Sequence, residues 1–355
     1  MADSINVSLS HLTDLQNAIK TQFLDRYLDN LDAIHTIQSS TKFKDSTALK
    51  ELGKLSQLIR SHATKIGIVL NPETFNPQNY AAVYKELKSL IDVVFLLFSV
   101  TPLFYTAQNK KMYAQFLLER LDSALLNLLN GLNFLSEELK GKLEDGSFDE
   151  NRLRSVGILW STCDALDDIS TKGNFGLLSD KVKVSSDMIN DVVTEIDEFL
   201  EDPESVLEGM ADLGLSDLET EDAGDSTETI KAIRPFMEVW KNKLKLIKLL
   251  LSSFNSTITS TTYNEKDYSG SMLDELNSLH QSIAEQVDDF ISDIYMADES
   301  FTAEDSKEEI SKLDATIRKM IKVIKNLNKS DQKKIKWINT WECKYFPSES
   351  NTLAK

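Results

Sequence analysis

The feature that most constrains this chain is a helical spacing of apolar residues that continues through almost its whole length. Between Leu12 and Ile34, for example, large apolar side chains recur at three- and four-residue steps. That spacing places them on one face of an α-helix, whereas a half-buried strand needs strict alternation. The chain of 355 residues contains only 12 glycines and 6 prolines. Strand-rich proteins need frequent turn residues, so this scarcity favours long helices joined by few loops.

The periodicity predicts ten helices, six before an acidic stretch and four after it. They cover residues 10–38, 46–69, 77–100, 106–140, 149–169, 175–201, 229–258, 270–297, 303–328 and 330–345. Long helices with short connections pack most simply as antiparallel neighbours. We therefore predict an all-α fold of two antiparallel helical bundles joined by an acidic segment. The predicted parts are an N-terminal bundle (1–202), an acidic disordered linker (203–228), a C-terminal bundle (229–346) and a tail (347–355).

The negative charge is concentrated in one stretch. The net charge is −18 at pH 7, yet residues 184–230 carry 16 acidic and no basic residues, so the other 308 residues sum to −2. Residues 307–344 hold a mild basic surplus, with 11 Lys/Arg against 5 Asp/Glu. This surplus could meet the acidic stretch within one molecule or across a partner. It is too small to predict nucleic-acid binding, which normally shows as a clear basic footprint.

The acidic segment 203–228 has three interpretations. The favoured one is a solvated, disordered linker, because the segment is highly charged and contains few aromatic residues. A second is a docking or export motif with four apolar residues at the spacing of such peptides: Leu207, Met210, Leu213 and Leu215. A third is a phosphorylation platform, because Ser205 and Ser216 each have glutamate at the third following position, which acidophilic kinases favour.

No constellation in the sequence indicates catalysis or metal binding. The motifs of zinc proteases, thiol oxidoreductases, serine hydrolases and phosphate loops are missing. Adjacent carboxylates such as Asp167 and Asp168 point about 100° apart on a helix, so they do not converge on one atom. Four histidines show no metal-ligand spacing between them: His11, His35, His62 and His280. We therefore predict a non-enzymatic protein with no cofactor and no bound metal.

The tryptophans and cysteines are predicted to lie in the core. The tryptophans stand beside Leu, Ile and Val in predicted helices: Trp160, Trp240, Trp337 and Trp341. Trp337 and Trp341 share a lysine-rich helix and are the best surface-binding candidates of the second half. Cys163 and Cys343 predict buried, reduced thiols in an intracellular protein.

No membrane span or signal peptide is expected. The first twenty residues lack an apolar run. The most apolar stretch, residues 90–104, is shorter than the ~20 residues that a span needs. It predicts a fully buried helix end.

Residues 159–203, LWSTCDALDDISTKGNFGLLSDKVKVSSDMINDVVTEIDEFLEDP, carry a resemblance to a known family. A helix with Trp160 and Cys163, a short break at 170–175, and a long helix that ends in an acidic Asp-Pro follow in that order. This arrangement resembles the cyclin-D-interacting protein family, whose members are also described as Id-like partners of helix–loop–helix transcription factors. Further similarity lies in SHATKIGIVLNPETF (61–75), IRPFMEVWKNKLKLIKLLL (233–251) and LDELNSLHQSIAEQVDDFISDIY (273–295).

The resemblance implies a two-bundle helical protein, similar in layout to talin- and vinculin-type bundles. It also implies a non-enzymatic regulator of cell-cycle progression and transcription in the cytoplasm and nucleus. Its partners would be cyclin-type or helix–loop–helix proteins, with no direct contact to nucleic acid. A different class stays open as the alternative, namely a cytoskeletal or membrane-trafficking adaptor built on vinculin-like bundles.

Overall fold

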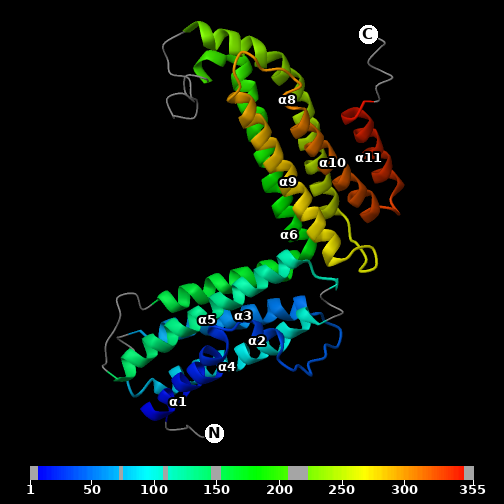
Figure 1. Ribbon diagram of the computed structural model, residues 1–355. Helices are drawn as coiled ribbons and strands as arrows, with labels where there is room; N and C mark the ends of the chain where they lie inside the picture. Colours follow the sequence, from blue (N-terminus) through cyan, green and yellow to red (C-terminus); the bar gives the residue numbers. More distant parts are fainter. Residues whose placement is uncertain (1–6, 72–74, 107–110, 145–152, 207–222, 348–355) are drawn as a thin grey trace. The chain divides into compact units, whose positions relative to one another are not determined.

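Every regular element that the structure describes is helical, which confirms the all-α prediction (Figure 1). The computed structural model describes residues 7–71, 75–106, 111–144, 153–206 and 223–347. In chain order the elements are α1 (Leu9–Ile19), the π-helical η1 (Lys20–Leu28), α2 (Asp32–His35), α3 (Ala48–Val69), α4 (Tyr80–Val100), the 3-10 helix η2 (Thr101–Tyr105), α5 (Gln115–Glu144), α6 (Arg154–Glu201), α8 (Ala223–Ser260), α9 (Gly270–Tyr295), α10 (Lys307–Leu327) and α11 (Gln332–Tyr345).

The chain divides into two compact helical units, Met1–Leu177 and Leu178–Lys355. The sequence placed the end of the first bundle at residue 202, after the second half of α6. In the structure this half of α6 belongs to the second unit instead. The predicted bundle boundary and the division between compact units therefore differ.

The break predicted at 170–175 is a single glycine inside α6. Gly173 has φ 54° and ψ −159°, a conformation that is essentially restricted to glycine. A Cβ atom added there would meet only Leu49 Cδ1, at 3.7 Å. The backbone conformation, and not lack of space, therefore explains the glycine.

The core of the first unit is built around α4 and α5. α4 packs against α3 and α1, and α1 also packs against α5. Both central helices bury a stripe at three- and four-residue steps, for example Val83, Leu87, Leu90 and Val94 of α4, all 0% exposed. Burial of each such side chain contributes about 1.5–3 kcal/mol, so these stripes position the remaining helices.

The stretch from Tyr80 to Tyr105 is long and apolar enough to cross a membrane by length and composition, but 61% of its most apolar window is buried inside the unit. Such burial is typical of the core helix of a bundle. The prediction of a fully buried helix end is nevertheless wrong. Phe95 and Leu96 are 45% and 54% exposed.

α3 and the first half of α6 approach each other closely through small residues. A Cβ atom at Gly53 would lie 2.5 Å from Ser170 Oγ, and the Ser170 hydroxyl donates to the Leu49 carbonyl at 2.7 Å. One helical turn further, the Ser56 hydroxyl donates to the Cys163 carbonyl at 3.0 Å. Cys163 is buried as predicted, and burial raises the pKa of its thiol to about 11. Cys343 is exposed, so its predicted burial is wrong.

In the second unit, the acidic second half of α6 pairs with lysines of α8. Asp197 forms ion pairs with Lys241 and Lys245, and the Lys248 ammonium donates to Asn190 Oδ1 at 2.6 Å. α9 packs against α8 and α10, and α11 packs against α8 and α10. The last helix therefore completes the second unit.

The predicted linker 203–228 is wrong at its described ends. Residues 203–206 are helical, and α8 begins at Ala223 instead of Thr229. Pro235 consequently lies inside α8. Residues 207–222 lie outside the part of the chain that the structure describes.

The close approach of α3 and α6 at Gly53 predicts that a larger side chain there destabilises the fold. Gly53→Val would push the new side chain into Ser170, so we expect the free energy of unfolding to fall by about 1–3 kcal/mol. Gly157 is the matched control, because nothing lies within 4 Å of its added Cβ atom. Denaturant titration of Gly157→Val should show a change of no more than about 0.5 kcal/mol. Equal losses in both variants would contradict the close approach of α3 and α6.

A buried histidine in the second unit predicts acid sensitivity. His280 is fully buried with Nδ1 2.8 Å from Ser185 Oγ, and Nε2 has no partner. Burial lowers the pKa of His280 from 6.5 to about 4. Between these values the unfolded chain takes up a proton that the folded chain excludes. The stabilisation by neutral His280 is therefore complete above pH 6.5 and is lost as the pH falls toward 4.

The full difference corresponds to about 3 kcal/mol of unfolding free energy. Between pH 6.5 and 4, we expect the free energy of unfolding of the unchanged chain to fall by this amount more than that of the His280→Gln variant. The measurement is urea unfolding of both proteins across that range. Parallel pH profiles would show that His280 is not held neutral.

Candidate protein-binding site

The histidines serve as links between elements and do not gather into a site. His35 Nε2 lies 2.8 Å from Asp122 Oδ1, which ties α2 to α5, and His62 Nδ1 lies 2.8 Å from Glu86 Oε2, which ties α3 to α4. Among the described residues, no group of three or more His, Cys, Asp or Glu side chains could hold a metal ion.

The predicted docking and phosphorylation residues fall mostly outside the described chain. Leu207, Met210, Leu213, Leu215 and Ser216 all lie in the segment that the structure does not describe. Ser205 is described. It is exposed, and its backbone N–H donates to Asp202 Oδ1 at 3.4 Å.

Two of the four tryptophans are exposed, although all four were predicted to lie in the core. Trp240 and Trp341 are buried, each 2% exposed, so the prediction of Trp341 as a surface-binding candidate is wrong. Trp160 and Trp337 are 40% and 38% exposed. Because large aromatic side chains are enriched at the energetic centres of protein interfaces, these two are the strongest binding candidates.

Trp160 stands on a stripe of the first unit that points away from the core. Leu153, just before α6, and Gly157, Trp160 and Asp164 on α6 follow one another at three- and four-residue steps, and all four are exposed. Leu153 is 55% exposed, and its Cδ2 lies 3.7 Å from the position of a Cβ atom on Gly67 of α3. Leu153 therefore lies against α3.

α3 completes the same surface. The Trp160 indole N–H donates to Thr64 Oγ1 at 3.1 Å. Ile68, one helical turn beyond Thr64, is 65% exposed. We call the set of Ile68, Leu153, Gly157 and Trp160 the α3–α6 surface.

The α3–α6 surface is fixed in place and has a polar edge. The Arg60 guanidinium donates to the Trp160 carbonyl at 3.2 Å and forms an ion pair with Asp164. The Thr64 hydroxyl thus holds the indole and Arg60 holds the backbone of the same residue before any partner arrives, which lowers the conformational entropy lost on binding. Exposed apolar side chains with a polar rim are the usual anatomy of a protein interface.

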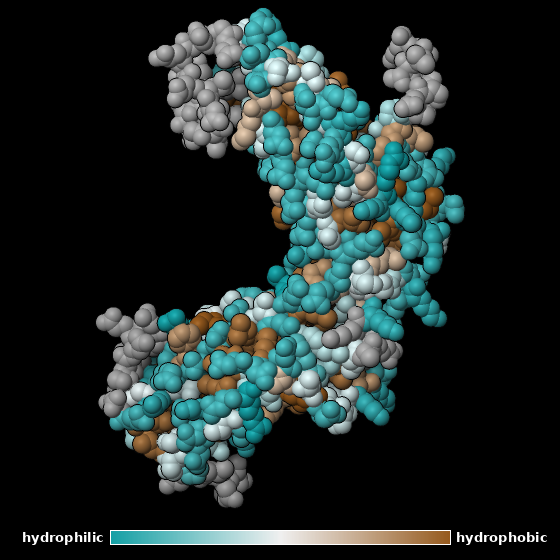
Figure 2. Space-filling view, viewed as in Figure 1, coloured by the Kyte–Doolittle hydropathy of each residue, from teal (hydrophilic) through white to brown (hydrophobic). Residues whose placement is uncertain are grey.

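Hydrophobic residues gather on the visible face of the first unit over α5 and α6 (Figure 2). The visible face of the second unit is mostly hydrophilic, with hydrophobic residues over α10 and α11 (Figure 2). The exposed, pre-positioned Trp160 makes the α3–α6 surface the leading candidate for contact with another protein.

Comparison with known proteins identifies the family. The N-terminal model of the Grap2 and cyclin-D-interacting family matches residues 51–202, and its C-terminal model matches residues 204–322. The chain therefore belongs to the Grap2 and cyclin-D-interacting family, which confirms the resemblance seen in the sequence. The two models adjoin at the predicted boundary near 202, whereas the compact units divide at Leu177. α11 lies beyond the matched residues.

Two fungal relatives cover nearly the whole chain. The uncharacterized protein YLR287C of Saccharomyces cerevisiae is 35% identical over 343 residues, which is 94% of this chain and 95% of that protein. The uncharacterized protein C22E12.18 of Schizosaccharomyces pombe is 21% identical over 326 residues, which is 88% of this chain and 89% of that protein.

Proposed function

We propose that this protein is a non-enzymatic regulator that binds a cyclin-D-type protein through the α3–α6 surface. By holding that partner it would restrain cell-cycle progression and transcription in the cytoplasm and nucleus. The observation that carries the proposal is the exposed Trp160 between Ile68 and Leu153, inside the residues matched by the N-terminal family model. The family description names cyclin D, so a cyclin-type partner takes precedence over a helix–loop–helix protein.

The geometry of the α3–α6 surface explains how a partner could gain affinity there. Nothing lies within 4 Å of an added Cβ atom on Gly157, so open space borders the indole of Trp160 one helical turn away. A partner side chain can enter this space and cover the indole. The Arg60–Asp164 pair at the edge offers charged groups of both signs for orientation and contributes little to affinity while it stays exposed to solvent.

Removal of the indole tests the proposal. In titration calorimetry of the full chain with a purified D-type cyclin, Trp160→Ala should weaken binding by about 30-fold, because a truncated interface tryptophan typically costs 2 kcal/mol or more. Gly157→Arg should weaken binding to a similar extent by filling the open space. Arginine is a good helix former, so the fold should remain intact.

The control is Trp337→Ala, a tryptophan of nearly equal exposure in the second unit, which should keep cyclin affinity within about three-fold of the unchanged chain. Helical circular dichroism and thermal melts confirm folding of each variant. Loss of binding in all three variants alike, or in none, would remove the α3–α6 surface from the proposal. If the unchanged chain fails to bind D-type cyclins at about 100 μM, the cyclin assignment itself is wrong.

A further inference from the structure

A groove of the second unit is lined by the exposed Trp337 and by helices that include α11. This groove of about 220 Å³ runs between α8, α10 and α11. Its apolar lining includes Leu250, Phe254, Ile324, Trp337 and Ile338, and serine and threonine side chains of α8 form part of its wall. Leu249, one helical turn before Ser253 of that wall, is 48% exposed.

One end of the groove is organised by polar contacts. The Lys334 ammonium, which lines the groove, donates to Thr261 Oγ1 at 2.6 Å and lies 3.5 Å from Asp331 Oδ2. The Tyr263 hydroxyl donates to Asn328 Oδ1 at 3.0 Å, and the Asn328 amide donates to the Ile324 carbonyl at 2.9 Å. The positive charge of Lys334 is thereby held at a defined place beside apolar side chains.

The chain around the groove has a basic surplus, although Asp331 lies beside Lys334 at one end and Glu342 pairs with Lys325. Residues 241–260, 315–329 and 332–341 together contain 12 Lys/Arg and no Asp or Glu. Five of these lysines are exposed and form none of the ion pairs found among the described residues: Lys319, Lys322, Lys329, Lys333 and Lys336. Their charge is therefore available to an anionic partner.

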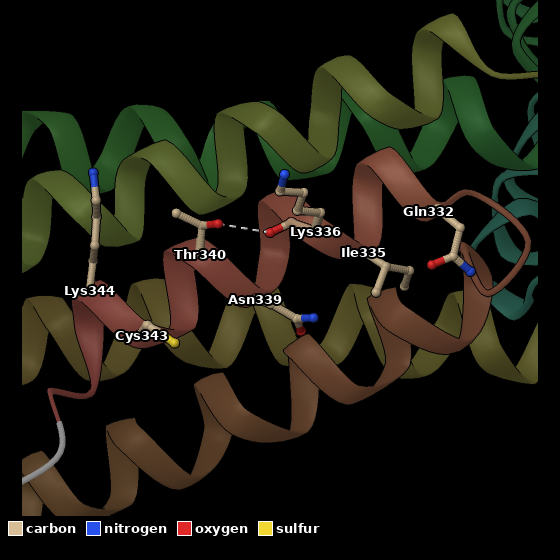
Figure 3. A pocket seen from close by; sticks show the side chains of 7 residues that line it. All are labelled: Gln332, Ile335, Lys336, Asn339, Thr340, Cys343 and Lys344. Atoms are coloured by element: carbon tan, nitrogen blue, oxygen red, sulfur yellow. Dashed lines mark hydrogen bonds between the residues drawn. The ribbon is translucent and has the colours of Figure 1, made fainter.

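The outer face of α11 is also basic. A shallow surface there is lined by seven residues, all from α11, and they include Lys336 and Lys344 but no carboxylate (Figure 3). α11 buries only Ile338, Trp341 and Tyr345, so most of its circumference stays accessible.

We propose that the groove around Trp337 binds an acidic amphipathic segment of another protein, which seats an apolar side chain against the indole. Its carboxylates pair with the neighbouring lysines. Apolar anchors combined with flanking charges are the usual means by which a helical groove selects a peptide. The groove shares no residue with the α3–α6 surface, so it is a different site from the proposed cyclin site.

The acidic segment of the same molecule cannot occupy the groove. Its undescribed part has 16 residues between Val206 and Ala223, so its midpoint reaches at most about 28 Å from either end. Ser253 lies 30 residues after Ala223 in α8, which is about 45 Å of helix. A stretch tethered at both ends therefore cannot lie along the groove, so this segment is not the occupant.

Nucleic acid fits less well than a peptide. A polyanion would extend over a chain whose net charge is −18, and the acidic helices would repel it. A short acidic peptide interacts mainly with charges within about 8 Å, the screening length at physiological salt. It therefore senses the lysines and not the whole molecule.

The test uses the full chain and a fluorescein-labelled helical peptide of about 14 residues, with Leu at i, i+4 spacing, one central Phe and Glu elsewhere. Fluorescence anisotropy should show saturable binding that weakens as salt rises. Trp337→Ala should weaken binding at least about ten-fold. The double variant K333E/K336E should weaken it by a similar factor without altering the apolar groove. Trp160→Ala should leave it unchanged, which separates this proposal from the cyclin proposal.

Three control measurements can overturn the proposal. A peptide with Lys in place of Glu should not bind, and equal binding of both peptides would exclude charge recognition. A single-stranded DNA oligonucleotide that competes more strongly than the acidic peptide would make nucleic acid the occupant. Sedimentation velocity that shows dimers lost in Trp337→Ala would make a second copy of the chain the occupant. No binding of the acidic peptide up to about 1 mM would also sink the proposal.

Discussion

The conformation of one residue, Gly173, allows a single helical run to supply two separate cores. Before it, Val156, Leu159 and Cys163 are buried in the first unit, and after it, Val182 and Ile196 are buried in the second. An uninterrupted helix would continue one apolar stripe at its own pitch, but each half must match the stripe of a different set of neighbours. The positive φ of Gly173 interrupts the helix at one residue, so the two halves of α6 can present differently oriented apolar stripes. A residue with a side chain would be strained there by about 1–3 kcal/mol.

The type of fold could be predicted from the sequence because helical periodicity is a local signal that tertiary packing here reinforces. The boundary of the units could not be predicted in the same way. Residues 184–202 are rich in carboxylates and lead into a more acidic stretch, so they resembled the edge of a linker. Their place depends on packing such as that of Phe199, fully buried, against Tyr295, more than ninety residues further along the chain. Such packing is a tertiary property that no local pattern contains.

The sequence favoured core positions for both exposed tryptophans and named only Trp337 as a surface-binding candidate, although a usable signal existed for both. Trp160 shares its helical stripe with Leu153, Gly157 and Asp164, whereas the core stripe of the same helix contains Val156, Leu159 and Cys163. A glycine and an aspartate on one stripe indicate the solvent side, whatever the hydrophobicity of the tryptophan between them. In α11, likewise, Lys333 and Thr340 flank Trp337, while Ile338, Trp341 and Tyr345 form the buried stripe. The apolar residues adjacent in sequence to each tryptophan suggested burial, whereas the residues on the same helical face indicated exposure.

Acidic and basic residues of the second unit are concentrated on different helices, which the net charge of the chain does not show. α9 contains six carboxylates and no lysine or arginine. Burial, together with the Asp288 and Asp191 carboxylates, raises the pKa of Glu195 on α6. Lys241, Lys245 and Lys248 of α8 are engaged by α6, and Lys325 of α10 is engaged by Glu342 of α11. Several lysines of α10 and α11 form none of these ion pairs, so a strongly acidic chain presents a basic surface around Trp337. A low isoelectric point therefore argues against long polyanions as partners, because these would extend over the acidic parts of the chain. It does not argue against short acidic peptides, because salt screening restricts their electrostatic interactions to nearby charges.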